Sequence, residues 1–339
     1  MAKYIVKRIL YMLLVVLILS FLIYLIFDLV PFDRAKWLVE KQKDVYKDNP
    51  EGYQRAYLEF RRRLGLDENV FVRYLGWLGL ARINGSYNGI LQGNFGYSYN
   101  FSRAATEVLS EPMKNTVFIN LFAVVLALAI TIPLGIFCAV KRGTRRDTAV
   151  QVFTIVGYSM PTFITAILFI CFFAVIIPIF PVIGMKTPGS NYTGIRKFFD
   201  QLYYMALPLI VMTFCSLGGM TRYVRSSMIE ALSMDCIRTA RAKGLKENTV
   251  VYSHAWRNAL VPVITLVIGW FLSVFSGSIM IENIFALNGV GIKYIEALQT
   301  NDYEVALLLQ MFYVAVSLLG NLIIDISYGI ADPRVRVAK

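Results

Sequence analysis

Residues 115–140 read NTVFINLFAVVLALAITIPLGIFCAV, a run of 26 residues that contains no Asp, Glu, Lys or Arg. A helix rises about 1.5 Å per residue, so roughly 20 apolar residues cross the hydrocarbon core of a bilayer. Five more uncharged runs, each of 19 to 38 residues, occur at 9–27, 148–185, 201–221, 258–281 and 305–324. With 57% hydrophobic and only 17% charged residues among 339, the chain is predicted to be a polytopic membrane protein. A soluble enzyme, a disordered chain and a fibre are excluded.

The length of these runs predicts helical spans. A spanning chain satisfies its backbone hydrogen bonds within helices or in a closed barrel, and barrel strands are only about ten residues of alternating character. The 38-residue run is cut by Pro178 and Pro181, so we predict a single helix from about 149 to 177. We expect Pro161 and Pro208 to mark kinks within spans. The prediction is an all-α protein with six transmembrane helices and both termini on one side.

The basic residues predict the orientation of these spans, because Lys and Arg near short loops are retained in the cytoplasm. The segments on one side carry 17 of the 34 Lys and Arg residues, whereas the short loops on the other side carry four. We therefore expect a multi-pass protein of the cell (inner) membrane with cytoplasmic termini. The net charge of +12 then reflects topology rather than nucleic-acid binding. The first apolar run is too long for a signal peptide and is kept as a span.

The sequence divides into four predicted parts. They are an N-terminal transmembrane helix (1–30), an extracytoplasmic subdomain (31–114), a core of five helices (115–330) and a cytoplasmic tail (331–339). Within the subdomain, five apolar residues recur at helical spacing: Tyr53, Ala56, Tyr57, Phe60 and Leu64. Gly65 then ends the pattern, and residues 84–96 are predicted to form loops. We expect a small, mainly α subdomain, which is either a passive cap or a surface for a partner or solute.

The chain lacks the motifs of an energy-converting or hydrolytic enzyme. It contains no Gly-x-x-x-x-Gly-Lys-Ser/Thr, no Gly-x-Ser-x-Gly and no His-Glu-x-x-His. Its single histidine, His254, and its four cysteines show no ligand spacing, so neither a metal site nor a disulfide framework is expected. Asp28, Glu282 and Asp325 lie at span ends, which does not favour a proton relay. A secondary transporter or channel, a membrane-embedded enzyme and a scaffold are the rival classes.

The largest predicted internal loop, residues 222–261, is suited to receive energy from another protein. Residues 226–241 contain no Gly or Pro and are predicted to be helical, and Gly244 follows as a left-handed cap. Small residues before this glycine suit a short helix packed in a partner's cleft. An amphipathic helix at the membrane interface, with snorkelling basic side chains, explains the same pattern equally well.

The motifs of this loop resemble those of a known family. The stretch 235–245, DCIRTARAKGL, followed by His254-Ala255-x-x-Asn258-Ala259-Leu260-Val261-Pro262, is similar to the cytoplasmic "EAA" loop of ABC importer permeases. Further matches follow the family's order along the chain: Tyr4-Ile5-x-Lys7-Arg8, Leu64-Gly65-Leu66-Asp67, Arg73-Tyr74-Leu75-x-Trp77, Gly93-Asn94-Phe95-Gly96-Tyr97-Ser98, Glu282-x-x-Phe285, Gly289-Val290-Gly291 and Asp332-Pro333-Arg334-Val335-Arg336. Together they resemble the oligopeptide/dipeptide (and nickel) importer branch, and within it the first, B-type, permease. The chain departs from the pattern where Arg238 and Thr239 replace the first two residues of "EAA".

The resemblance implies a type I ABC importer permease fold and a function. The chain would form half of the translocation pathway of an ATP-driven importer of oligopeptides or dipeptides. Its partners would be a homologous second permease, two ATP-binding cassette ATPase subunits, an extracytoplasmic solute-binding protein and the lipid bilayer, but no nucleic acid. The chain would not be an enzyme and would bind no cofactor, since ATP and Mg would belong to the ATPases. Alternatives are a nickel-chelate, opine or glycan cargo, and an ATP-independent secondary transporter.

Three sets of site residues are expected. The ATPase-coupling loop would present Glu230, Asp235, Arg238, Thr239, Ala240, Arg241, Ala242, Lys243, Gly244 and Leu245. The external turn would depend on Gly289 and Gly291. The pore lining would come from spans two to six, and the candidate residues are Asn120, Ser159, Thr162, Ser216, Ser273 and Ser276. Helix–helix packing by small polar residues is the alternative explanation for each of them. No catalytic and no metal-binding residue is expected.

Overall fold

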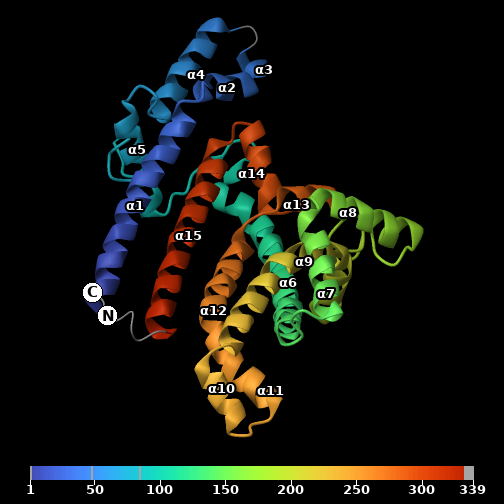
Figure 1. Cartoon of the computed structure of the whole chain (residues 1–339). Helices are drawn as coiled ribbons and strands as arrows, with labels where there is room; N and C mark the ends of the chain where they lie inside the picture. Colours follow the sequence, from blue (N-terminus) through green and yellow to red (C-terminus); the bar gives the residue numbers. More distant parts are fainter. Residues whose placement is uncertain (1, 47–48, 84, 332–339) are drawn as a thin grey trace. The chain divides into compact units, whose positions relative to one another are not determined.

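The computed structural model describes residues 2–46, 49–83 and 85–331, which form a helical protein with one two-stranded hairpin (Figure 1). The chain divides into two compact units. The first comprises residues 1–111 and 293–315, and the second comprises residues 112–292 and 316–339. Most of the predicted tail (331–339), with the motif at 332–336, lies outside the described residues.

The first unit begins with a long apolar helix and continues as a mainly α subdomain, as predicted. Its elements are α1 (Ala2–Asp28), α2 (Arg34–Lys41), α3 (Lys43–Tyr46), α4 (Pro50–Arg63), α5 (Val70–Leu78), a 3₁₀ turn (Ile90–Gln92), β1 (Tyr97–Ser98) and β2 (Arg103–Ala104). Side chains of Asp33, Asn49 and Asn69 cap the starts of α2, α4 and α5. The left-handed Gly65, at φ +65°, follows the end of α4 at the predicted position.

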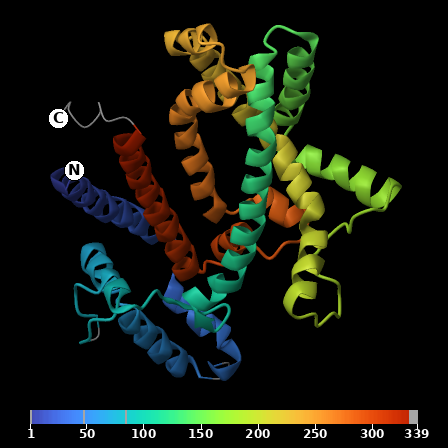
Figure 2. The same cartoon turned by 90° about the horizontal axis from the view of Figure 1, so that it is seen from below.

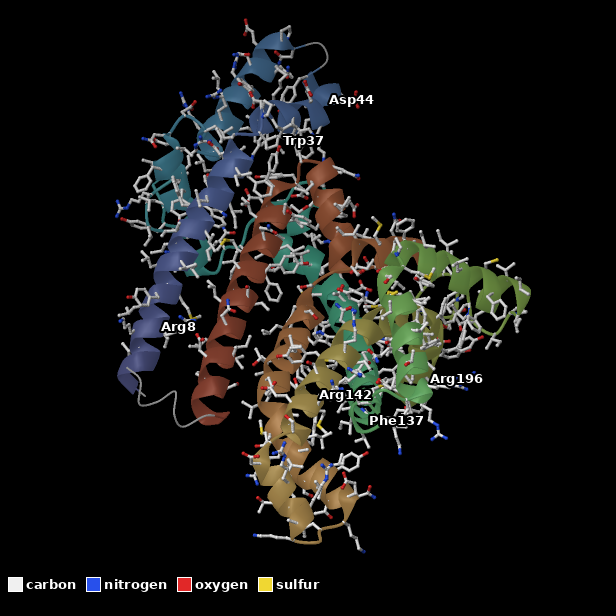
Figure 3. The ribbon with its side chains drawn as sticks, in the orientation of Figure 1. Arg8, Trp37, Asp44, Phe137, Arg142 and Arg196 are labelled. Carbon is white, nitrogen blue, oxygen red and sulfur yellow. The ribbon has the colours of Figure 1, made fainter. Side chains whose placement is uncertain are left out.

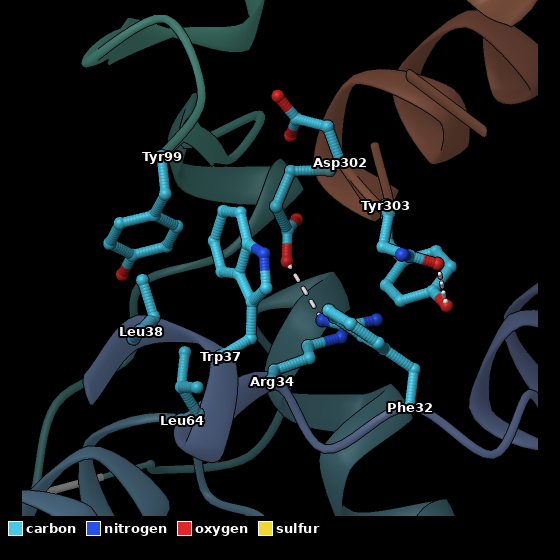
Figure 4. A pocket seen from close by; sticks show the side chains of 10 residues that line it. Phe32, Arg34, Trp37, Leu38, Leu64, Tyr99, Asp302 and Tyr303 are labelled. Carbon is cyan, nitrogen blue, oxygen red and sulfur yellow. Dashed lines mark hydrogen bonds and ion pairs between the residues drawn. The ribbon is translucent and has the colours of Figure 1, made fainter. Parts of the chain in front are cut away.

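Polar contacts fasten this subdomain to the start of α15 (Tyr303–Ala331). Arg34 Nη1 lies 3.2 Å from Glu304 Oε1 in a pocket whose wall includes Trp37 (Figure 4). The Ser98 hydroxyl donates to the carboxylate of Asp302. Burial raises the pKa of Asp302, although the hydrogen bond from Ser98 partly opposes this shift. The motif around Ser98 therefore has a structural role within this unit.

The second unit contains most of the remaining long helices. Its elements include α6 (Ala105–Val140), α7 (Arg145–Ser159), α8 (Thr162–Ile170) with a π-helical turn (Cys171–Ile176), α9 (Gly194–Leu232), α10 (Asp235–Ala242), α11 (Glu247–Thr249), a π-helical turn (Val250–Ala255), α12 (Trp256–Leu272), a 3₁₀ turn (Ser273–Phe275), α13 (Ile279–Ile284) and α14 (Val290–Gln299). In Figures 1 and 2, α10 and α11 lie at the end of α9 and α12 that is remote from α13. Parts of α6, α14 and α15 belong to the first unit.

Five described helices are long and apolar enough to cross a membrane, and a sixth span results if α7 and α8 count as one. The predicted single helix over 149–177 is wrong, because α7 and α8 meet at a bend of 101°. Met160 and Pro161 adopt extended conformations there, since a residue before proline is disfavoured in the helical region. Pro208, by contrast, lies inside the continuous helix α9.

One further helix prediction was wrong. The helix predicted over 226–241 is two helices, because Met234 is extended between α9 and α10. The run 258–281 does overlap one candidate span, Glu247–Phe275, but α12 ends at Leu272 and the chain continues through a 3₁₀ turn into α13. Neither break carries a proline.

The core of the second unit depends on close approach of α7 and α9. A Cβ atom on Gly218 would lie 2.5 Å from the carbonyl oxygen of Thr154, and one on Gly157 would lie 2.7 Å from that of Phe214. These glycines let the two helix backbones touch, which is a common packing mode of membrane helices. The crossing is reinforced near one end by an ion pair between Asp147 and Arg225.

Candidate functional site

The predicted loop 222–261 presents a short exposed helix, α10. Only Ile237 and Ala240 among its eight residues are buried, and they pack in one apolar cluster with Val250, Val251 and Ala255 of the π-helical turn. The spacing of three between the two buried residues puts them on one face of the helix. The opposite face is exposed in the described part of the chain and is rich in charged side chains.

The end of α10 is built as the sequence predicts. Gly244 has φ +76°, and its N–H donates to the carbonyl of Arg241 at 2.9 Å. The N–H of Leu245 reaches the carbonyl of Ala240 at 3.4 Å, which completes a left-handed helix cap. Arg241 also pairs with Glu247 at 2.6 Å, so the chain is fixed on both sides of the glycine.

A two-residue link joins α10 directly to the 39-residue helix α9. The Ser233 hydroxyl donates to the carbonyl of Glu230 at 2.7 Å and so closes the last turn of α9. One turn and a half earlier on α9, Arg225 donates from Nε and Nη2 to the two carboxylate oxygens of Asp147 at 2.9 and 2.8 Å. α10 is thus joined to α9 by a short link, and α9 is joined to α7 through Asp147.

The structure places the predicted coupling residues on one continuous surface, with two exceptions. Asp235, Arg238, Thr239, Arg241, Ala242, Lys243, Gly244 and Leu245 are exposed on or just beyond α10. Ala240 faces inward instead, and Glu230 belongs to the last turn of α9. Arg238 and Asp235, which are 76% and 93% exposed, approach each other at 3.4 Å.

A cavity of about 660 Å³ opens between α6, α7, α9 and α12. Four of the six predicted pore-lining residues meet there: Asn120, Ser216, Ser273 and Ser276. Ser159 and Thr162 flank the bend between α7 and α8 and do not line this cavity. None of the described residues that line it carries a formal charge. The prediction from polar residues missed the large apolar and aromatic part of the wall: Tyr158, Met212, Met220, Tyr223, Leu266 and Trp270.

Asn120 has a structural task at the cavity wall. Its Nδ2 donates to the carbonyls of Val274 and Ser276 at 3.0 and 2.8 Å. These carbonyls are unpaired where α12 ends, so the asparagine satisfies backbone groups that the break in the helix leaves open. Its amide is consequently not free to bind a passing solute with the same hydrogens.

The structure assigns Gly289 and Gly291 a steric role. Neither has a positive φ, so a left-handed turn does not explain them. A Cβ atom on Gly289 would lie 2.2 Å from Cδ of Glu282, and one on Gly291 would lie 2.9 Å from Oε2 of the same residue. The two glycines make room for a buried carboxylate that sequence reasoning had noted only as lying at a span end.

Comparison with known proteins links the chain to membrane transport. Residues 131–337 match the family model of the binding-protein-dependent transport system inner membrane component, and residues 1–120 match the N-terminal model of such components. Over 336 residues the chain is 32% identical to the oligopeptide transport system permease protein AppB of Bacillus subtilis, with 99% of each chain covered.

Two further comparisons agree with this result. The chain is 32% identical over 293 residues to the dipeptide transport system permease protein DppB of Escherichia coli, which covers 81% of this chain and 84% of that protein. Among solved structures, a chain of the inward-facing MetNI methionine ABC transporter matches with a TM-score of 0.50 at 17% identity, covering 66% of this chain and 97% of that one. The structural likeness concerns the fold alone.

Proposed function

This chain belongs to the family of binding-protein-dependent transport system inner membrane components, and from that premise we propose how it works. It is a permease subunit of an ABC importer, related to B-type permeases of oligopeptide and dipeptide systems. We propose that it forms half of a pathway for short peptides and pairs with a homologous permease. The membrane components of such systems do not hydrolyse ATP themselves, so the energy has to come from other subunits.

The observation that carries the proposal is the exposed helix α10, held between α9 and α12. We propose that the exposed residues around Arg238 and Gly244 dock on one of two ATP-binding cassette ATPases, which bind ATP and Mg. The short link between α10 and α9 and the ion pair between α9 and α7 support this proposal. A docking helix on a long flexible loop would not transmit motion to the membrane helices. Moving a two-state equilibrium from 1:99 to 99:1 takes about 5.5 kcal/mol, which ATPase closure has to supply.

The neutral cavity supports a peptide cargo. Its serine hydroxyls and aromatic side chains offer weak contacts, and the absence of formal charge among its described lining residues avoids trapping either charged end of a peptide. Selectivity would then rest with an extracytoplasmic solute-binding protein. A nickel chelate, an opine and a glycan are the alternative cargoes.

The predicted orientation fits this assignment. We propose that α10 and the turn between α6 and α7 face the cytoplasm, together with both termini. Lys141, Arg142, Arg145 and Arg146 are all exposed at that turn, where Figure 3 marks Arg142. We keep the predicted divisions, with a first transmembrane helix (1–30), an extracytoplasmic subdomain (31–114), a core (115–330) and a cytoplasmic tail (331–339).

Reconstitution tests the proposed function. The chain is co-expressed with the permease, ATPase and binding-protein genes that neighbour it, and the purified complex is placed in liposomes with a labelled tripeptide. ATP-dependent uptake that unlabelled peptides block, and that nickel chelate, opine and oligosaccharide do not, is the expected result. Uptake of one of those competitors in place of peptide overturns the cargo, and uptake without ATP overturns the importer.

Charge reversal tests the docking face. Arg238→Glu inverts an exposed charge on α10, and we expect it to lower uptake and the amount of co-purified ATPase at least about fivefold. Arg146→Glu is the matched control, because it inverts an equally exposed charge at the turn between α6 and α7. Equal effects of the two variants would contradict the assignment of α10.

A further inference from the structure

The segment 273–291, which runs from the end of α12 to the start of α14, forms part of the cavity wall. Ser273, Ser276, Gly277 and Ser278 line the cavity wall, and the chain then forms the six-residue helix α13. The segment starts where α12 ends, at the opposite end of α12 from the loop that carries α10. Because its backbone is broken by a 3₁₀ turn and by irregular stretches, it is not held in place by a continuous helix.

Three side chains of α6 hold this segment. Asn115 Nδ2 donates to the carbonyl of Asn288 at 2.9 Å, and Asn120 holds two further carbonyls near the end of α12. The hydroxyl of Thr116 accepts from the N–H of Val290 at 3.0 Å and donates to Oε1 of Glu282 at 3.1 Å. Thr116 and Asn120 are one turn apart and share a face of α6, whereas Asn115 lies beside that face.

Glu282 is the centre of these contacts. Its side chain is nearly inaccessible, with 3% of the residue exposed. Besides the Thr116 hydroxyl, it accepts from the N–H of Ser278 at 3.2 Å and from the N–H of Ile292 at 2.9 Å. One carboxylate therefore joins the two ends of the folded-back segment and ties both to α6.

The chemistry of these bonds makes the fastening strong and reversible. Among the residues that the structure describes, no ion pair to Glu282 occurs, so its charge is held by neutral donors. Hydrogen bonds to a charged acceptor are stronger than neutral ones, and a buried charge is costly once its donors leave. Gly289 and Gly291 bring the backbone against the carboxylate, and Gly277 lies so close to Gly291 that a Cβ atom would fall 2.4 Å from the Gly291 nitrogen.

We propose that Thr116 and Glu282 form a latch that holds segment 273–291 as a gate at the outer end of the cavity. This inference rests on the proposed transport function. In the state seen here the latch is closed, and a solute can cross only when the segment moves away from α6. Thr116 and Glu282 are positioning residues, since they act through the backbone of the segment and do not touch the cargo.

The latch is tested by measuring, in the absence of ATP, the passive leak of labelled tripeptide through the complete complex in liposomes. Thr116→Val keeps the shape of the side chain, removes its hydroxyl and leaves the Val290 N–H without this acceptor, so we expect passive leak of labelled tripeptide to rise about fivefold. Glu282→Gln replaces a carboxylate, which only accepts hydrogen bonds, by an amide whose NH₂ group would face the N–H donors of the segment. We expect it to raise the passive leak of labelled tripeptide on the order of tenfold. Thr154→Val is the matched control, because Thr154 is equally buried but bonds only to its own helix, and its leak should stay within about twofold of the original chain.

A second experiment crosslinks the segment to α6, so its result does not depend on the stability of the Thr116 and Glu282 variants. Asn115→Cys and Asn288→Cys are combined, and a short bis-maleimide bridges the two cysteines across the contact between α6 and the segment. We expect the bridge to stop ATP-driven uptake, measured against the same double-cysteine protein treated with a monofunctional maleimide. Unchanged leak in both assembled latch variants, or normal transport by the bridged protein, overturns the latch.

The two proposals fail in different ways. Leak of labelled sucrose, measured beside that of the tripeptide, reports the gate whatever the natural cargo is. If the original complex shows no ATP-driven peptide uptake while the latch variants still leak sucrose, the cargo is wrong and the latch stands. If ATP-driven uptake is normal and the variants leak no more than the original complex, the proposed latch is refuted and the transport function stands.

Discussion

Removing Arg225 is the perturbation with the most closely defined consequence. The carboxylate of Asp147 is 2% exposed and accepts four hydrogen bonds, two from Arg225, one from Gln151 at 2.8 Å and one from the Gly143 N–H at 3.0 Å. Arg225→Met keeps much of the side-chain volume but leaves this carboxylate buried with only the two neutral donors. Breaking a buried pair from one side costs about 3–5 kcal/mol.

The double variant separates the ion pair from packing. Asp147→Leu combined with Arg225→Met removes both charges, and replacing a buried pair by apolar groups of similar size is close to neutral. We therefore expect the double variant to be more stable than either single one, with a coupling free energy of about 3 kcal/mol. The free energy of unfolding is measured by titration with denaturing detergent, followed by intrinsic fluorescence.

A surface pair provides the control for this experiment. Arg238→Met breaks the exposed pair with Asp235, and such pairs contribute only about 0–1 kcal/mol. Arg225→Met should also lower the amount of peptide transported per ATP hydrolysed, because the ion pair that makes α7 move with α9 is lost. Equal shifts in the free energy of unfolding for Arg225→Met and Arg238→Met, or simply additive losses from the two single variants at 147 and 225, would contradict a buried ion pair that couples α7 to α9.

Three further predictions follow from the same structure. Gly244→Asp, which adds a negative charge to the proposed docking face, should raise ATP hydrolysis per peptide transported, while Gly244→Asn, which has nearly the same shape and tolerates φ +76° similarly but is neutral, should couple nearly normally; equal coupling ratios would contradict this. Gly218→Val, which drives Cβ to 2.5 Å from a backbone oxygen, should lower stability by at least about 2 kcal/mol in the detergent titration, whereas Gly269→Val, with open space around it, should not. Because burial raises the folded-state pKa of Asp302 above its unfolded value, the first unit should lose stability as pH rises from about 4 through the raised value; Asp302→Asn should flatten that slope of melting temperature against pH.

Much of the fold could be predicted from the sequence, because only helices and closed barrels satisfy their backbone hydrogen bonds inside a bilayer. Uncharged runs of about 20 residues have to be helices, and five of the six described spans are single helices that contain all or most of a predicted run. The cap at Gly244 was also accessible, because a glycine after small helical residues favours a left-handed end. The signal is local in both cases.

The breaks in helices were less accessible from the sequence. Pro161 predicted a kink, and the bend of 101° lies there, but its size exceeds that of a kink within one span. Ser276-Gly277-Ser278 is a turn signal close to the end of α12, but it does not place that end at Leu272, beyond which Asn120 of another helix donates to the carbonyls of Val274 and Ser276. Of the six polar residues predicted to line a pore, four line the cavity and two lie at the bend between α7 and α8.

The role of Glu282 shows what a motif alone conceals. In the sequence, Glu282-x-x-Phe285 and Gly289-Val290-Gly291 are two consecutive motifs of the family resemblance. The two glycines were expected to form an external turn. In the structure the glycines are needed for space around a carboxylate rather than for backbone freedom. Only the fold brings Thr116, which is 166 positions away, to the same carboxylate.

Site-directed crosslinking from α10 tests most directly whether this chain takes its energy from a separate ATPase. A photoreactive amino acid at Thr239, on the exposed face, is activated in the assembled complex with and without ATP, beside the same probe at Tyr252 in the π-helical turn. We expect crosslinks from Thr239 to an ATPase subunit whose yield changes with nucleotide, and weaker ones from Tyr252. A complex that transports peptide while Thr239 never reaches an ATPase would contradict it.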